Sequence, residues 1–253
     1  ERISGVKFDI DRLRQYMRES EKAENDLVRV LQSAKNRPSP IDGYFGAVYY
    51  IGPIFTAFRG TPEASQFYSL LRQEIDERVR LGKGPITPDG EMGEEKYRLV
   101  TEGPPNWTSF RDFWKMFYDE GAVVVASTYS KVGGLYDFGF RHDADNPLES
   151  LADYCLGCYT NLNLPSRIDM ICKYIDEYQA DGLLINSIKS CNSFSAGQLL
   201  ILREVEKRTG KPAAFIETDL VDPRYFSAAN VKNRLESYFQ MIKAKRVAAA
   251  AVH

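Results

Sequence analysis

No hydrophobic run in this 253-residue sequence approaches the roughly 20 residues that a helix needs to cross a bilayer. A leader with a charged and then an apolar stretch is also lacking. Charge is nearly balanced, because 33 Lys and Arg residues face 35 Asp and Glu residues, and no extended basic run is present. We therefore expect a cytoplasmic protein that binds neither a membrane nor nucleic acid.

Cysteine is scarce as well. The four cysteines are Cys155, Cys158, Cys172 and Cys191, which are too few for a disulfide framework in a chain of this length and favour metal binding, redox chemistry or burial. The spacing of Cys155 and Cys158 lets one metal or cluster take both sulfurs, and it also suits a dithiol pair. Because no second pair follows, zinc is only moderately indicated. Cys172 borders the apolar face of an expected helix, where core packing is its expected role.

The first part of the chain has helical patterns. We expect helices over Ile10–Lys35 and Glu63–Arg80, where apolar residues recur at helical spacing. Between them, the apolar and aromatic segment 41–57 fits a buried helix or a strand equally well. Residues 81–95 are rich in Gly, Pro and charge, which is typical of a linker. The expected division is a helical segment with its linker over residues 1–90 and a second domain over residues 91–253.

After the linker, short apolar runs alternate with helical patterns. The expected strands are Tyr97–Thr101, Ala122–Ser127, Gly182–Asn186 and Ala213–Ile216. The expected helices are Ser109–Tyr118, Pro147–Leu156, Ile168–Gln179, Ser195–Arg208 and Ala228–Ile242. Near-continuous apolar strands that alternate with helices are typical of parallel sheets covered on both sides. The sequence therefore predicts an α/β fold, an open parallel sheet of about four strands with helices on both faces, preceded by a helical segment.

Cys191 lies where the third expected strand gives way to a helix, and open α/β sheets carry their chemistry at this edge. Small hydrogen-bonding residues surround it, namely Ser190, Asn192, Ser193 and Ser195. A helix from about Ala196 would point its positive N-terminal end at the sulfur and would stabilise a thiolate or an anionic cluster. The alternative is an inert, buried cysteine.

The other loops at this edge hold aromatic and basic residues. Aromatic rings at Trp107, Tyr129, Tyr225 and Phe226 could line a flat apolar pocket, and Lys131 or Arg224 could meet an anionic group. Each loop also has a simpler interpretation as a turn. The candidate substrate-binding residues are Trp107, Tyr129, Lys131, Ser193, Arg224 and Tyr225.

Several motifs from Arg98 to Ile242 carry a family resemblance. They include Asp181-Gly-Leu-Leu before Cys191, Phe215-Ile-Glu-Thr-Asp219 after it, and a last helix with Asn233-Arg-Leu-Glu-Ser-Tyr238. This region resembles the C-terminal domain of the benzoyl-CoA reductase and 2-hydroxyacyl-CoA dehydratase superfamily. Four further motifs are most similar to the B-type subunits of ATP-dependent benzoyl-CoA reductases: Glu102-Gly-Pro-Pro-Asn-Trp, Gly133-Gly-Leu-Tyr, Tyr154-Cys-Leu-Gly-Cys-Tyr and Lys189-Ser-Cys-Asn-Ser-Phe-Ser.

The resemblance implies a catalytic subunit that binds an acyl-CoA thioester beside a 4Fe-4S cluster. Its implied partners are a homologous catalytic subunit and a separate activator that hydrolyses ATP to supply electrons singly. In the reductases the ring of benzoyl-CoA becomes a cyclic dienoyl-CoA, and in the dehydratases a ketyl radical expels a 2-hydroxyl group. The resemblance implies Cys191 as a cluster ligand, and the spacing permits Cys155 and Cys158 to join it.

The chain departs from the family pattern in one respect. Relatives carry an additional N-terminal domain with further cluster cysteines, whereas this sequence has no cysteine before Cys155. We therefore expect either a C-terminal piece of a family member or an incompletely ligated cluster. Three hypotheses remain: a benzoyl-CoA reductase subunit, a 2-hydroxyacyl-CoA dehydratase subunit, and a non-catalytic structural or assembly domain with a thiolate zinc site. A dithiol oxidoreductase built on Cys155 and Cys158 is a weaker fourth.

Overall fold

The computed structural model describes residues 1–43, 59–87, 89–131 and 138–251. Most of the ambiguous apolar segment and the Gly133-Gly-Leu-Tyr motif lie outside these ranges. The first part forms helix α1 (Ile10–Gln32), the short helix η1 (Ser33–Lys35) and helix α4 (Pro62–Arg80). The Asp9 carboxylate caps α1 and the Thr61 hydroxyl caps α4, so each helix begins where its first free backbone N–H groups find an acceptor. Both predicted helices are confirmed.

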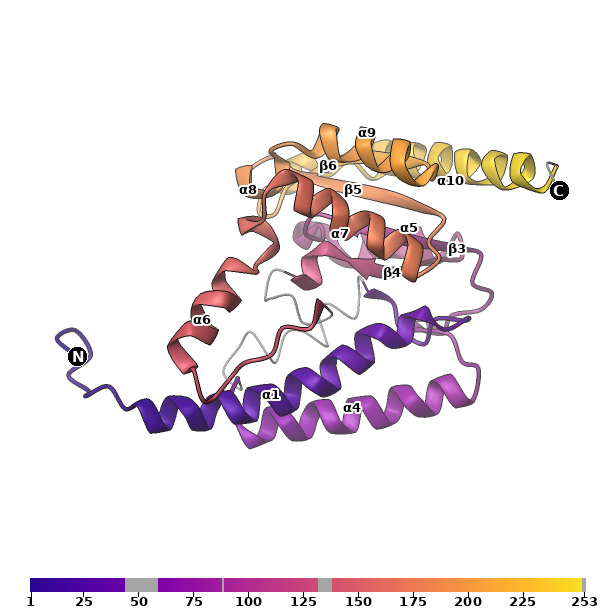
Figure 1. Cartoon of the computed structure of the whole chain (residues 1–253). Coiled ribbons are helices and arrows are strands. Elements are labelled where there is room, and N and C mark those ends of the chain that lie inside the picture. The colour runs from indigo at the N-terminus through magenta and orange to yellow at the C-terminus, as the bar shows by residue number, and fades with distance from the viewer. Residues whose placement is uncertain (44–58, 88, 132–137, 252–253) are drawn as a thin grey trace.

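Helices α1 and α4 lie side by side beneath the sheet (Figure 1). A small apolar cluster of Ala23, Leu27, Val28, Leu31 and Tyr68 joins them. Farther along α1, Val30 belongs to the larger core cluster, which also holds residues of the central sheet. The helical segment is therefore packed against the sheet by shared apolar contacts. The boundary at residue 90 stays a prediction.

The expected linker contains a small hairpin. Strand β1 (Ile86–Thr87) pairs antiparallel with strand β2 (Gly90–Glu91). Gly90, paired with Thr87, begins β2 with φ +114°, a backbone conformation that favours glycine, and the linker interpretation overlooked this turn signal.

The central sheet has four parallel strands: β3 (Tyr97–Glu102), β4 (Ala122–Ser127), β5 (Gly182–Ile188) and β6 (Ala213–Thr218). Their spatial order is β4-β3-β5-β6, with Leu99 of β3 paired to both Val124 and Gly182. The chain thus passes from β3 to one neighbour and then returns to the other side of β3. The switch point of this topology lies between β3 and β5, where open α/β sheets place their ligands.

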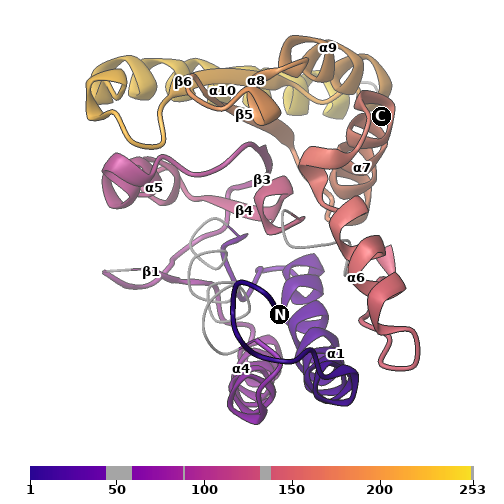
Figure 2. The same cartoon turned by 90° about the vertical axis from the view of Figure 1, so that its left-hand side faces the viewer.

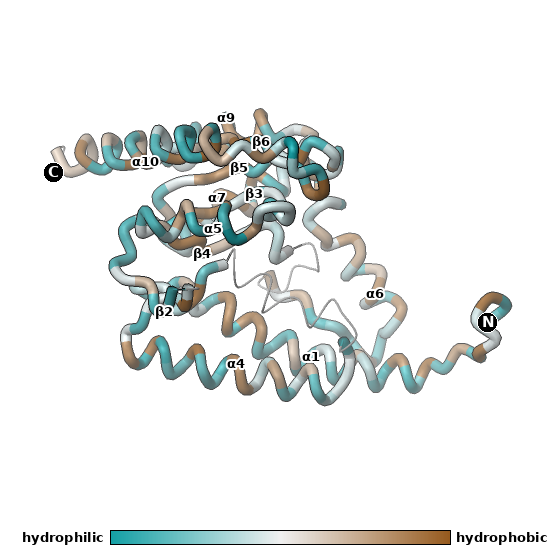
Figure 3. Tube along the Cα trace, turned by 180° about the vertical axis from the view of Figure 1, so that it is seen from behind, coloured by the Kyte–Doolittle hydropathy of each residue, from teal (hydrophilic) through white to brown (hydrophobic). Residues whose placement is uncertain are grey.

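Helices cover both faces of this sheet (Figure 2). Helices α5 (Phe110–Tyr118) and α10 (Ala228–Ala250) pack on one face against Leu99, Val124 and Leu184. Helices α7 (Leu164–Glu177) and α9 (Gln198–Thr209) pack on the other face. They contact the strand residues that alternate with those three, because successive side chains of a strand point to opposite faces. In Figure 3 the helices carry a mixture of hydrophilic and hydrophobic residues along their length. The predicted α/β fold is confirmed.

The expected helix over Ser195–Arg208 is wrong in one detail that bears on the site. It is divided into α8 (Asn192–Ser195) and α9, because Gly197 adopts φ +82° between them. The expectation of one helix starting at Ala196 therefore fails, and α9 does not begin next to Cys191. Helix α6 (Pro147–Leu156) has its predicted bounds, and α10 runs beyond Ile242 through an alanine-rich stretch that favours helix.

Across the described ranges, every helix is too short or too polar to span a lipid bilayer.

Candidate functional site

Hydrogen bonds link the loops at the carboxyl ends of all four parallel strands. The Thr101 hydroxyl donates to the Ser127 hydroxyl at 2.8 Å, and the N–H of Gly103 donates to the Thr128 hydroxyl at 3.2 Å. These two bonds join the ends of β3 and β4. The expectation that the loops meet along one edge is therefore borne out on this side of the sheet.

Asn186 continues the connection across the switch point. Its amide nitrogen donates to the carbonyl of Pro104 at 2.6 Å, and its amide oxygen accepts from the Thr218 hydroxyl at 2.9 Å. Asn186 is fully buried, so each of these bonds is shielded from water. One side chain thus joins the ends of β3, β5 and β6.

Position 103 at this edge requires glycine, both because of its backbone conformation and because of the atoms close to it. It adopts φ +94°, and an added Cβ would lie 2.2 Å from the carbonyl oxygen of Asn186. Gly139 offers a matched control, because it adopts φ +98° with nothing within 4 Å of its added Cβ. We expect Gly103→Ala to lower the free energy of unfolding by at least about 2 kcal/mol more than Gly139→Ala does. Urea unfolding of both variants measures this difference, and equal losses would contradict the close approach.

Cys191 lies in the loop after β5, and the preceding residue, Ser190, is hydrogen-bonded to Asp219. The Asp219 carboxylate accepts the backbone N–H of Ser190 at 3.0 Å and those of Val221 and Asp222 at 3.0 and 3.1 Å. These hydrogen bonds lower the pKa of Asp219 to about 2, with that from Val221 the largest cause. Cys191 itself is half-buried and contacts the main core cluster. It is therefore neither deep in the core nor fully exposed.

Arg167 ties the segment around Tyr159 to helix α8. It is 7% exposed, and its guanidinium donates to the carbonyls of Leu162, Ser193 and Thr160 at 3.1, 2.9 and 2.7 Å. It also lies 5.0 Å from the centre of the Tyr159 ring. A cavity of about 360 Å³ opens beside it, lined by Leu162, Leu164, Arg167, Asn192, Ser193, Ala196 and Gly197. Ser193 thus lines a cavity next to Cys191, and its carbonyl accepts a hydrogen bond from Arg167.

Glu102 is a fully buried carboxyl group at the last position of β3. The Tyr159 hydroxyl donates to one of its oxygens at 3.1 Å, and the side-chain amide of Gln198 donates to the other. Burial raises the pKa of Glu102 to about 7, although these hydrogen bonds and the charge of Arg167 act in the opposite direction. Sequence reasoning quoted Glu102 in a motif and gave it no role. The available signal was an acidic residue that ends a buried strand at the switch point.

Cys155 and Cys158 lie around the end of α6. Cys155 is exposed, whereas Cys158 is half-buried with its sulfur 3.5 Å from the carbonyl of Tyr154. Burial, and then the neighbouring Cys155, raise the pKa of Cys158. Within the described ranges, no three His, Cys, Asp or Glu side chains gather closely enough to hold a metal ion. The joint ligand set of Cys155, Cys158 and Cys191 stays a prediction.

Cys172 packs on helix α7 against the main core cluster, and burial raises the pKa of its thiol. Its predicted role in core packing is confirmed.

Trp107 and Tyr129 form an aromatic pair at the ends of β3 and β4. Their ring centres are 6.1 Å apart in an edge-on arrangement, and Trp107 stacks on Phe110 at 5.4 Å. Burial raises the pKa of Tyr129. Lys131 ends a short 3-10 helix (Thr128–Lys131), and its side chain lies outside the described residues. The structure therefore brings two of the predicted aromatic residues together.

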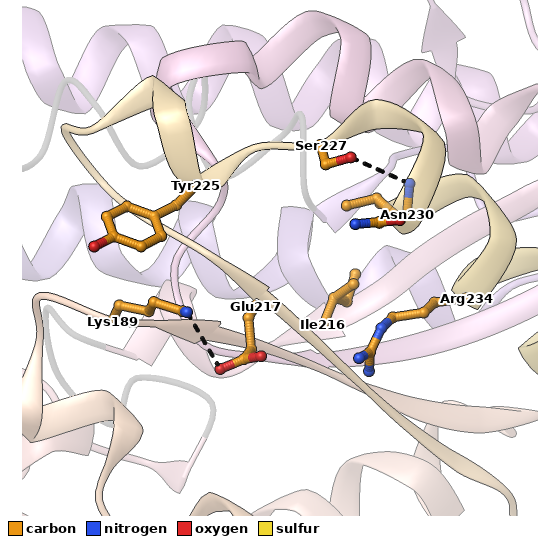
Figure 4. A pocket seen from close by; sticks show the side chains of 8 residues that line it. Lys189, Ile216, Glu217, Tyr225, Ser227, Asn230 and Arg234 are labelled. Atoms are coloured by element: carbon orange, nitrogen blue, oxygen red, sulfur yellow. Dashed lines mark hydrogen bonds and ion pairs between the residues drawn. The ribbon is translucent and has the colours of Figure 1, made fainter.

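Tyr225 lies at the other end of the strand order, beside β6. Its ring centre is 4.9 Å from the Lys189 ammonium group, which is 3.9 Å from a Glu217 carboxylate oxygen. Figure 4 shows these groups around a cavity of about 170 Å³ that also contacts Ser227, Asn230 and Arg234. Arg224, expected to meet an anion, is exposed and pairs with Asp222 at 2.5 Å. Lys189 and Arg234 line the cavity instead, and sequence reasoning gave neither a role.

Known proteins identify the family to which this site belongs. Residues 1–242 match the model of the 2-hydroxyglutaryl-CoA dehydratase, D-component family. The chain is 77% identical over 250 residues to the B-type subunit of benzoyl-CoA reductase from Thauera aromatica, covering 99% of this chain and 58% of that protein. It is 27% identical over 248 residues to the (R)-phenyllactyl-CoA dehydratase alpha subunit of Clostridium sporogenes, covering 98% of this chain and 57% of that protein.

A third relative is the alpha subunit of (R)-2-hydroxyglutaryl-CoA dehydratase from Acidaminococcus fermentans. It is 25% identical over 244 residues, covering 96% of this chain and 48% of that protein. The chain thus spans about half to three fifths of the length of these relatives. The resemblance inferred from the motifs is confirmed: the chain belongs to the 2-hydroxyglutaryl-CoA dehydratase, D-component family.

Proposed function

We propose that this chain is part of a catalytic subunit of an ATP-dependent benzoyl-CoA reductase. The observation that carries the proposal is the 77% identity to a benzoyl-CoA reductase subunit, against 24–29% to four dehydratase alpha subunits of similar coverage. The reaction is a low-potential, one-electron reduction of an aromatic acyl-CoA. A 2-hydroxyacyl-CoA dehydratase subunit is the second candidate, because both activities occur among these relatives.

An iron-sulfur cluster would supply the low-potential electrons of this reaction. The described residues fit it only in part, since they offer Cys191 at the sheet edge without a group of three ligands. We therefore assign one thiolate ligand, Cys191, to this edge, and Cys155 and Cys158 remain candidates for the same cluster. The contribution of the chain's other residues is positional: Asp219 fixes Ser190, and Arg167 fixes Ser193, on either side of the cysteine.

The residues lining the carboxyl edge of the sheet indicate which part of the acyl-CoA each would bind. The Trp107 and Tyr129 rings suit the flat ring of an aromatic acyl group. The cavity beside Tyr225 is lined by Lys189 and Arg234, so it suits a polar or anionic part of the thioester better than a ring. Lys131, Ser193 and Arg224 remain substrate-binding candidates. The proposed partners are a homologous catalytic subunit and an ATP-hydrolysing activator.

The test is anaerobic reconstitution of the full-length subunit with its partner subunit and activator. With ATP and a reductant, the complex is given benzoyl-CoA or a 2-hydroxyacyl-CoA, and products are identified by mass spectrometry. The proposal expects a cyclic dienoyl-CoA from the first substrate. Loss of the 2-hydroxyl group from the second substrate alone would favour the dehydratase. Zinc without iron or labile sulfide would favour the structural alternative.

Trp107 provides a specific prediction about the aromatic acyl group. We expect Trp107→Ala to weaken binding of benzoyl-CoA to the complex by about 1–3 kcal/mol, the scale of burying a large side chain. Tyr16→Ala is the control, because Tyr16 is 39% exposed and Trp107 40% exposed, yet Tyr16 lies on helix α1 and not in a loop that follows a strand. Calorimetric titration measures both variants. Unchanged affinity in Trp107→Ala would place the ring elsewhere.

A further inference from the structure

The cavity beside Tyr225 has the charge and the size to hold one anionic group. Lys189 reaches it from the loop after β5 and Arg234 from helix α10, and Figure 4 shows these two side chains on either side of Glu217. Two cations and one carboxylate give the lining a formal charge of +1. Its volume of about 170 Å³ exceeds the roughly 30 Å³ of a water molecule but falls short of the roughly 300–1,000 Å³ of pockets that enclose whole small molecules. The cavity therefore fits one charged group of a larger ligand.

Both cations are available to such a group. The Lys189 ammonium nitrogen is 3.9 Å from the nearest Glu217 oxygen, which is beyond hydrogen-bond distance. Arg234 donates through one terminal nitrogen to the carbonyl of Phe215 at 2.9 Å. A guanidinium has five N–H donors, so this bond orients Arg234 and leaves donors for an anion. Within the described ranges, neither cation is thus committed to a carboxylate at close range.

Helix α10 adds the positive end of its backbone dipole to the cavity. It runs for 23 residues, and its first intrahelical bond joins the N–H of Val231 to the carbonyl of Ser227 at 3.0 Å. The N–H groups of Ala228 and Ala229 precede this bond, and the first turn carries no acidic residue. Ser227 and Asn230 of this turn line the cavity. An anion there is favoured by the helix as well as by the two cations.

The cavity lies on the same face of the sheet as the aromatic pair. Its lining residues Ile216 and Val231 belong to the core cluster beneath α5 and α10, and Phe110, on which Trp107 stacks, packs against that cluster. Strands β4 and β6 are three strand spacings apart, which is about 14 Å. The pantetheine arm of CoA has about as many chain bonds as four extended residues and therefore also spans about 14 Å. A thioester whose ring lies at Trp107 can reach the cavity with its phosphates.

We propose, on the basis of the proposed function, that this cavity binds the pyrophosphate of the CoA nucleotide and that the pantetheine arm crosses the ends of β3 and β5. Lys189 and Arg234 pair with phosphate oxygens, and the first turn of α10 donates backbone N–H groups. Glu217 repels the anion and limits its affinity. The β6 side of the edge thus recognises CoA, which is common to ring reduction and 2-hydroxyl loss, while the aromatic pair selects the acyl group.

The test is calorimetric titration of the full complex with three thioesters: benzoyl-CoA, benzoyl-dephospho-CoA, which lacks the 3′-phosphate, and benzoyl-pantetheine, which has no phosphate. We expect Lys189→Gln and Arg234→Gln each to raise Kd for the first two by about 10-fold, the scale of a hydrogen bond to a charged group, and to leave Kd for benzoyl-pantetheine unchanged. Glu217→Gln should lower Kd for the first two by about 3-fold, a gain that damage to the fold does not produce. Lys232→Gln is the control, because it removes the same charge from an exposed position on α10 outside the cavity.

Wild-type affinity for benzoyl-CoA in Lys189→Gln and Arg234→Gln would overturn the proposal, as would an equal loss for benzoyl-pantetheine or weaker binding in Glu217→Gln. An Arg234→Gln effect that vanishes with benzoyl-dephospho-CoA would overturn the assignment to the pyrophosphate and indicate the 3′-phosphate instead. The same titrations with a 2-hydroxyacyl-CoA separate this inference from the proposed function, because the nucleotide is identical. A complex that shows these effects but does not reduce the ring would overturn the proposed function and leave the phosphate site standing.

Discussion

Replacement of Cys191 by alanine is expected to abolish incorporation of the iron-sulfur cluster in the reconstituted complex while the chain still folds. Cys191 is half-buried at the switch-point edge and donates no side-chain hydrogen bond that the fold depends on within the described part of the chain. Its replacement therefore removes the proposed thiolate ligand without leaving a buried polar partner. Iron and labile sulfide, counted per complex after anaerobic purification, measure the effect, and circular dichroism checks the fold.

Cys172→Ala is the matched control for this experiment. Cys172 is also half-buried against the main core, but it lies on helix α7 and away from the carboxyl edge. We expect full iron and sulfide in this variant with a small loss of stability. Full cluster content in Cys191→Ala would remove Cys191 from the ligands, whereas equal losses in both variants would indicate a general effect of unfolding.

Arg98→Ala is expected to destabilise the fold by about 3–5 kcal/mol, because it breaks a buried ion pair and leaves a carboxylate behind. Arg98 is 1% exposed and lies 2.7 Å from Glu95, whose side chain is 7% exposed. The guanidinium also donates to the carbonyls of Ala34, Asn36 and Tyr178 at 2.5, 3.1 and 2.9 Å. One side chain thus fastens the start of β3 to the end of α1 and to the segment after α7.

Urea unfolding of Arg98→Ala measures this loss. Arg14→Ala is the comparison, because Arg14 forms an exposed ion pair with Asp11 within α1, and removal of such a pair costs no more than about 1 kcal/mol. Similar losses in the two variants would show that burial of the Arg98 network contributes little.

The arrangement of the sheet was predictable because its signals are local and strong. The apolar run Ala122–Ser127, for example, has the bounds of β4, since a strand covered on both faces needs apolar residues throughout. Parallel pairing then placed the loop of Cys191 at the carboxyl edge. The division of α8 from α9 was missed, because Gly197 in a helical pattern gives only a weak indication of a break.

The buried polar network could not be predicted in the same way. Glu102, Tyr159 and Gln198 are far apart in the sequence and meet only through packing of three different elements. Burial of Arg167 likewise depends on carbonyl groups that the fold assembles around it. Arg224 was a candidate because its loop follows a strand at the carboxyl edge, and the sequence did not reveal that its guanidinium donates to the carboxylate of Asp222, two positions earlier.

The most direct measurement is an anomalous diffraction map at the iron absorption edge, from crystals of the anaerobic complex with its acyl-CoA. If the edge between β3 and β5 is where electrons reach the thioester, iron density will adjoin the Cys191 sulfur, and the acyl group will lie nearby. Iron bound elsewhere, with the sulfur of Cys191 uncoordinated, would contradict this placement.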